Sequence, residues 1–190
     1  KLTEFAPNTT GVPYGVDKEK EIIKQLFDVG CLFDLLSDLE VFKKSFLKSA
    51  KAEISYRPEK NISSVHQVLN DIIDTSLLIA KKDILKGDDE KSKFAEIYTG
   101  LNQFRSSVFV GKFGISEAQV AGSKAAYLAS IILTDYKGTI QKFSPNTPLS
   151  DYMITHPEYN FLNKRLKFVA QGEALFYWHK SIDILHRENK

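Results

Sequence analysis

Residues 116–143 read SEAQVAGSKAAYLASIILTDYKGTIQKF, and this stretch decides the fold. Apolar side chains recur in it at intervals of three and four residues, which is the spacing of one face of an α-helix. Ser116 and Glu117 fit a helix start, because a serine oxygen accepts from an unpaired backbone N–H and a carboxylate suits the positive helix end. The sequence therefore predicts one bundle helix here, with this apolar face: Ala118, Ala121, Ala125, Leu128, Ile132, Tyr136, Ile140 and Phe143.

Helical periodicity continues on both sides of this stretch. Further helices are expected over residues 17–53, 63–86, 88–110 and 158–187. Gly30 is expected to bend or divide the first of them, and a break is expected near Gly172 in the last. Strand-type alternation does not extend over six residues outside these segments, so the sequence predicts an all-α protein.

Short connections between the middle helices predict that they are antiparallel neighbours. The expected architecture is an up-and-down bundle of four to five helices with an extended N-terminal arm. Prolines and glycines among polar residues assign the arm to residues 1–16. Residues 17–143 are the predicted bundle, and residues 144–190 are a loop and a C-terminal helix packed on it or extending it.

Composition excludes several classes of protein. A chain of 190 residues with 43% hydrophobic residues forms a proper core and is not disordered. The uncharged, mostly apolar run of residues 125–134 is too short to span a membrane. A net charge of +2 and only four arginines argue against a protein dedicated to binding nucleic acid.

A single cysteine, Cys31, excludes an internal disulfide, and its apolar surroundings predict a buried, inert thiol.

The sequence contains no constellation that predicts catalysis or metal binding. His179 and His186 share a helical face with Asp183, but seven residues separate the two histidines by about 10 Å, too far to bind one ion. Gly111 and Gly114 resemble a short phosphate loop without its flanking strand, so a helix–helix turn is expected. We therefore expect no catalytic residue, no cofactor and no metal ion.

Basic residues give the best indication of a binding surface. Lys44, Lys48 and Lys51 follow one another at helical spacing, and Arg57 and Lys60 follow in the adjoining loop. Such a stripe can bind an acidic partner or an anionic surface in a salt-dependent way, or it can be a solvated helix face. A second candidate contact lies near the C-terminus.

That second contact is the pair Tyr177 and Trp178, which follow Phe176 in a predicted helix. Three consecutive residues of a helix cannot all face one side, so at least one of these aromatic rings is expected at the surface or against another element. Exposed aromatic residues favour a protein interface. The alternative, that Trp178 covers the core, remains open.

The chain starts at Lys1 rather than at methionine, which indicates either an artificial boundary or the removal of a targeting segment. We therefore favour a processed protein outside the cytosol. Asn8 and Asn61 begin N-glycosylation sequons, which matter only if the chain enters the secretory pathway.

Two segments resemble the PsbQ-type extrinsic subunits of photosystem II. SLLIAKKDILKGDDEKSKFAEIY, from Ser76, is similar to a helix, a lysine-rich turn and a helix of that family, and ISEAQVAGSKAAYLASIILTDYKGTI is similar to its last helix. The chain after Phe143 has no counterpart there. The resemblance implies a four-helix bundle in the thylakoid lumen that carries no cofactor and stabilises a membrane complex.

The expected function is therefore binding rather than catalysis. We expect a peripheral accessory subunit of a larger assembly, which the resemblance identifies as a photosynthetic membrane complex. Its partner would be a protein with an acidic surface, with no nucleic acid and no transmembrane segment involved. The alternative is a secreted or surface-displayed helical ligand-binding protein of a microbe or parasite. A helical enzyme would need a polar pocket inside the bundle, which the assigned core faces do not supply.

Overall fold

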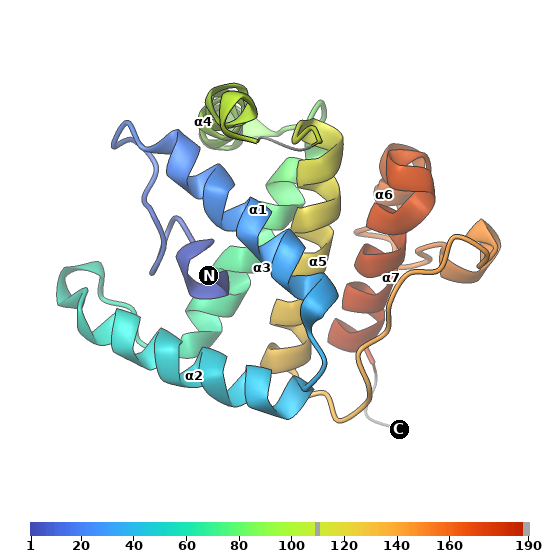
Figure 1. Ribbon diagram of the computed structural model, residues 1–190, viewed down its shortest axis with the longest axis horizontal. Helices are drawn as coiled ribbons and strands as arrows, with labels where there is room; N and C mark the ends of the chain where they lie inside the picture. The colour runs from blue at the N-terminus through green and yellow to red at the C-terminus, as the bar shows by residue number, and fades with distance from the viewer. Residues whose placement is uncertain (109–110, 188–190) are drawn as a thin grey trace.

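A computed structural model of the protein describes residues 1–108 and 111–187. The described part is all-helical and contains no strand, so the predicted fold class is confirmed at this level. Figure 1 shows the arrangement of the helices. Their bounds are α1 Glu19–Leu35, α2 Leu39–Ser55, α3 Val65–Lys81, α4 Gly87–Phe104, α5 Ile115–Leu133, α6 Phe161–Leu166 and α7 Glu173–Leu185. Short 3-10 turns join them: η1 Leu2–Glu4, η2 Pro58–Lys60, η3 Arg105–Ser107, η4 Leu149–Tyr152 and η5 Val169–Gly172.

Helix α5 is the centre of the fold. It packs against α1, α3 and α7, and α3, α5 and α7 lie side by side in Figure 1. Its alanines are buried, which lets these three neighbours approach it closely. Gly30 of α1 faces Ala121, and a Cβ atom at Gly30 would lie 3.1 Å from the Ala121 Cβ. The small residues of the sequence thus make room for a helix surrounded by other helices.

The prediction that this helix continues to Phe143 was wrong, because α5 ends at Leu133. Asp135 adopts a left-handed backbone conformation with φ of 49°. The Tyr136 N–H then donates back to the Ile131 carbonyl at 3.0 Å. This left-handed cap is a common way to end a helix, because it satisfies carbonyl groups that otherwise lack a partner. The apolar residues beyond it belong to a long loop.

The first predicted helix is two helices, and they divide at residues 36–38 rather than at Gly30. Gly30 remains inside α1 because its missing side chain is used in the contact with α5. Asp38 starts α2, where its carboxylate accepts from the Val41 N–H at 2.9 Å. The division makes α1 and α2 meet at a corner (Figure 1).

Helices α3 and α4 are not the antiparallel neighbours that the short connection predicted. Helix α4 packs mainly on α1. In Figure 1, α4 is seen nearly along its axis, whereas α3 is seen from the side. The close approach of Gly100 to the backbone of Glu19 allows this crossing. The predicted end of this helix at Val110 lies outside the described residues, and α4 already passes into a 3-10 turn after Phe104.

The C-terminal segment is broken where the sequence predicted it. Ala170, Gln171 and Gly172 all have positive φ, so the chain turns sharply between α6 and α7. Helix α7 then packs along α5, and the loop of residues 134–160 covers its other side. The phenyl ring of Phe143 and the ring of Tyr152 both pack on Phe176 from this loop.

The N-terminal segment is not an extended arm. It folds into the η1 turn and further turns, and it buries Leu2, Phe5 and Ala6 in the core. Asp71 of α3 holds it in place, because its buried carboxylate accepts from the Asn8 N–H at 2.9 Å and the Asn8 side chain at 2.6 Å. These are charge-assisted hydrogen bonds, which are among the strongest in proteins. Composition alone did not indicate this partner.

Replacing this carboxylate by an amide, Asp71→Asn, should loosen the N-terminal segment. The free energy of its local opening should fall by about 1 kcal/mol, because neutral hydrogen bonds replace charge-assisted ones. The amide N–H of Gly11, which donates to the Ala6 carbonyl, should then exchange with solvent about fivefold faster. Asp74→Asn is the matched control, since Asp74 is an exposed carboxylate of the same helix and the bonds of Asn8 and Thr9 go to Asp71. Equal exchange in both variants would contradict the assignment.

Candidate functional site

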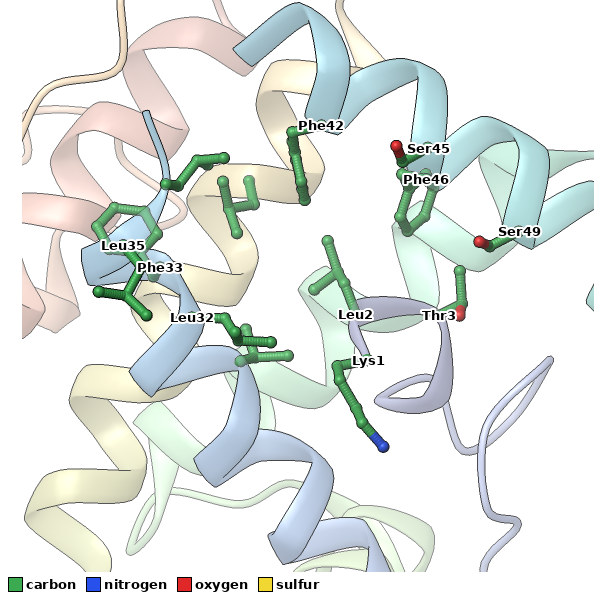
Figure 2. Close-up of a pocket in the computed structure, with 13 residues that line it drawn as sticks. Lys1, Leu2, Thr3, Leu32, Phe33, Leu35, Phe42, Ser45, Phe46 and Ser49 are labelled. Atoms are coloured by element: carbon green, nitrogen blue, oxygen red, sulfur yellow. The ribbon is translucent and has the colours of Figure 1, made fainter. Parts of the chain in front are cut away.

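An apolar groove of about 400 Å³ lies between α1, α2 and the N-terminal turn. Figure 2 shows Leu2 between the α1 side chains and the phenyl rings of Phe42 and Phe46 on α2. Leu128 of the central helix α5 also lines the groove. The corner between α1 and α2 creates this space, because the two helices diverge from it and only the N-terminal turn fills part of the opening. These are the lining residues: Lys1, Leu2, Thr3, Val29, Leu32, Phe33, Leu35, Leu36, Phe42, Ser45, Phe46, Ser49 and Leu128.

Two leucines on the α1 side of the groove are exposed to solvent. Leu32 is 52% exposed and Leu35 is 78% exposed. Single exposed leucines are ordinary, but two of them beside an apolar groove extend it into one continuous apolar surface. Helix α1 therefore carries more apolar side chains than the face that the bundle buries.

The predicted lysine stripe lies on the adjoining helix. Lys44, Lys48 and Lys51 are all exposed on α2. Helical spacing places Lys48 beside the groove residue Ser45 and turns Lys44 and Lys51 farther from the groove. Only Lys48 of the stripe therefore flanks the groove, and Lys44 and Lys51 lie on the side of α2 that faces away from it.

Arg57 and Lys60 lie apart from this stripe, at the far end of α2. They line a polar pocket of about 570 Å³ formed with the N-terminal segment. The Arg57 guanidinium is already paired with the carboxylate of Glu53, and Glu59 lines the same pocket. Acidic and basic groups alternate here, so these two residues do not continue the basic surface.

Tyr177 and Trp178 are buried rather than at the surface, which for Trp178 is the alternative that the sequence left open. Trp178 is 1% exposed and Tyr177 is 2% exposed. The reason is the loop of residues 134–160, which covers the side of α7 that would otherwise face solvent. The Tyr177 hydroxyl accepts from the Phe143 N–H of this loop at 3.1 Å, and burial raises the pKa of this hydroxyl. Trp178 covers the core.

A charged cluster joins three helices near these aromatic rings. The buried Lys124 ammonium of α5 pairs with Asp34 of α1 at 3.0 Å and with Glu173 of α7 at 3.0 Å. Its Nζ also lies 5.4 Å from the centre of the Phe33 ring, within the range of a cation–π contact. The arrangement ties the helices together and leaves the ammonium engaged on several sides.

The thiol of Cys31 is exposed, which corrects the prediction of a buried residue. It lies on the outer side of α1 and lines a shallow pocket with Asp34 and Lys124. The sulfur atom is still partly shielded from water, and this partial burial raises the pKa of the thiol. The neighbouring carboxylates of Asp28 and Asp34 raise it further. A raised pKa keeps it protonated at neutral pH and lowers its reactivity.

Two histidines from distant parts of the sequence lie together. The ring of His156 packs on that of His186 with centres 4.1 Å apart. Burial and the neighbouring His156 lower the pKa of His186, and burial and Lys180 lower the pKa of His179. Within residues 1–108 and 111–187, no three histidine, cysteine or acidic side chains are grouped closely enough to hold a metal ion.

The groove is thus an apolar pocket that continues into the exposed side chains of Leu32 and Leu35. None of the described helices combines the length and the apolar character needed to cross a membrane. Comparisons of the chain with protein-family models, with curated proteins and with solved structures found no match. The function is therefore inferred from the geometry of the site.

Proposed function

We propose that this protein is a non-enzymatic binding protein, an accessory subunit that holds a partner protein in the groove between α1 and α2. The observation that carries the proposal is the continuous apolar surface formed by the groove and the exposed Leu32 and Leu35. Burial of exposed leucine side chains is favourable by about 1.5–3 kcal/mol each. A partner that covers them gains this energy without rearranging the bundle.

The occupant we infer is one amphipathic helix of the partner. A groove between two helices presents rows of apolar side chains, and a third helix fills it with side chains at positions i, i+3 or i+4, and i+7. Phe42 and Phe46 on α2 and Leu32 and Leu35 on α1 stand at this spacing on the two walls. The hydroxyl groups of Ser45 and Ser49 give the groove a few polar contacts.

Charge selects the orientation of this helix. Lys48 flanks the groove on the α2 side, with Lys44 and Lys51 behind it. A partner helix with acidic residues along the corresponding edge would be attracted to this flank, and salt would weaken the attraction. We therefore propose a partner that is apolar on one face of its helix and acidic beside it.

The test is a quantitative pull-down from native extract at several salt concentrations, followed by affinity measurement with each purified candidate. Leu32→Glu combined with Leu35→Glu should lower the affinity of the true partner at least tenfold, because two charges would be buried in the apolar interface, each costing about 1 kcal/mol or more. Reversing Lys44, Lys48 and Lys51 to glutamate should weaken binding most at low salt. Tyr98→Glu with Met153→Glu is the matched control, since these residues are 50% and 37% exposed and lie outside both the groove and α2.

A partner that binds the groove variant and the control with Tyr98→Glu and Met153→Glu equally would show that the groove is not the interface. If charge reversal of the lysine stripe leaves affinity unchanged at every salt concentration, the acidic character of the partner is wrong. The resemblance to PsbQ-type subunits names a photosynthetic membrane complex as the assembly to test first. Loss of the protein from isolated photosystem II particles on salt washing would support that choice.

A second candidate function is the binding of a small apolar ligand by a secreted or surface-displayed protein. It is favoured by the groove volume of about 400 Å³, since small-molecule sites usually measure about 300–1,000 Å³. Native mass spectrometry of the purified protein distinguishes the two functions, because a small ligand would add its mass to the chain. Glycan on the exposed Asn61 would favour the secreted protein.

A further inference from the structure

Phe168 is the most exposed large hydrophobic residue of the described chain. It is 81% exposed, and it lies where α6 turns toward α7. Figure 1 places α6 beyond α5, on the side of the molecule away from α2. The groove and this corner are therefore separate surfaces, and the proposed function does not use Phe168.

The fold holds this phenyl ring outside. Leu166 before it and Ala174 after it are fully buried, so both ends of the corner are anchored in the core. Ala170 and Gln171 between them adopt left-handed backbone conformations with φ of 45° and 58°. Such conformations are unfavourable for a residue with a side chain. The anchored ends thus maintain a strained turn that presents Phe168 to solvent.

Basic residues precede Phe168 in the chain, and one of them lies against its ring. Lys164 is exposed, and the Lys167 Nζ lies 4.7 Å from the centre of the Phe168 ring. Arg165 is paired with Asp83 at 3.4 Å, so the two lysines are the main positive groups that face outward with the ring. Residues 161–171 contain no acidic residue.

We propose that this corner, residues 164–168, binds the surface of an anionic phospholipid bilayer. Phe168 would enter the boundary between headgroups and acyl chains, and Lys164 and Lys167 would lie among the negatively charged headgroups. A single exposed ring is too little apolar surface for a stable protein interface, which needs about 1,000 Å² of buried area. A bilayer accepts one projecting ring with lysines beside it, because the lysine stems extend along the apolar region while their ammonium groups stay in water.

The test uses the whole protein and phosphatidylcholine vesicles with and without phosphatidylserine. The reporter is Phe168→Trp, since the one natural tryptophan, Trp178, is buried. Its emission should shift to shorter wavelength only with the anionic vesicles. In flotation assays, Phe168→Ser should lower the partition coefficient about tenfold. Lys164→Glu with Lys167→Glu should lower it at least about thirtyfold, as each lysine near the surface contributes roughly a factor of five.

Two matched controls distinguish binding through this corner from non-specific attraction of the whole protein to anionic vesicles. Tyr56→Ser removes another ring, 76% exposed, and should leave vesicle binding unchanged. Lys44→Glu with Lys48→Glu changes the net charge equally and should alter binding by less than about threefold, because the stripe is screened at that distance. Unchanged emission of Phe168→Trp with anionic vesicles would overturn the proposal. The proposal would also be overturned if charge reversal of Lys44 and Lys48 weakened vesicle binding as much as charge reversal of Lys164 and Lys167. It would be overturned as well if the corner variants weakened binding to a protein partner but not to vesicles.

Discussion

Removing both carboxylates of the Lys124 cluster, Asp34→Asn with Glu173→Gln, is expected to lower the free energy of unfolding by about 3 kcal/mol. The Lys124 side chain is only 8% exposed, whereas those of Asp34 and Glu173 are 61% and 24% exposed. A buried ammonium without its partners keeps the full penalty of leaving water. The rings of Phe33 and Tyr177 compensate a part of it, which sets the expected loss at the lower end of the range for such pairs.

The same cluster predicts an asymmetry that a simple loss of contacts would not. Lys124→Met alone should cost clearly less than the double substitution, because the freed carboxylates are near solvent and regain water. Lys124→Met in the double variant should restore most of the lost stability, since it removes the isolated charge. Urea unfolding of the four proteins gives the comparison. If the triple variant is less stable than the double variant, the ammonium is not the source of the penalty.

A second large effect is expected at Gly100, where Gly100→Ala should lower the free energy of unfolding by about 2 kcal/mol. An added Cβ would lie 2.6 Å from the carbonyl carbon of Glu19. Backbone atoms at the start of α1 cannot move aside as a flexible side chain does, so α4 must shift away from α1. The gain in helix propensity, about 1 kcal/mol, offsets only part of this overlap.

Gly122→Ala is the matched control, because Gly122 also lies inside a helix and faces a neighbouring helix. There an added Cβ would meet the Cα of Ser76 at 3.7 Å, which is ordinary van der Waals contact. The alanine should therefore stabilise the protein by up to about 1 kcal/mol. Thermal unfolding of both variants should give shifts of opposite sign. Two shifts of the same sign would mean that helix propensity, rather than the crossing of α4 and α1, decides the outcome.

Local periodicity was enough to predict the helical class and the central helix, but it did not predict where helices end. Continuing apolar spacing through Tyr136 suggested a longer α5. The ending is fixed by contacts between distant residues, such as the Lys43 Nζ that donates to the Tyr136 carbonyl at 2.5 Å. A sequence pattern that looks only a few residues ahead does not contain that contact. Gly30 was misjudged for the same reason, since its role depends on Ala121 of another helix.

The candidate site was predictable in part. The lysine stripe followed from spacing alone, and its three residues are exposed on α2. The groove beside it was missed because it depends on the angle between α1 and α2, which spacing does not report. Tyr177 and Trp178 were misplaced because a loop with little periodicity covers them. The sequence did contain one signal for Leu32 and Leu35. Helix α1 has more leucines than one buried face can accommodate, so some of them had to be exposed.

The central position of α5 also affects how the chain acquires its shape during synthesis. A ribosome releases α1 and α3 before α5, but α7 emerges about 40 residues after α5 ends. During that interval the side of α5 that later meets α7, with Ala126 and Ser130, has no covering helix and stays in contact with water. Nascent chains halted before residue 173 should therefore attract chaperones and be cut readily by proteases, and chains released after residue 187 should not.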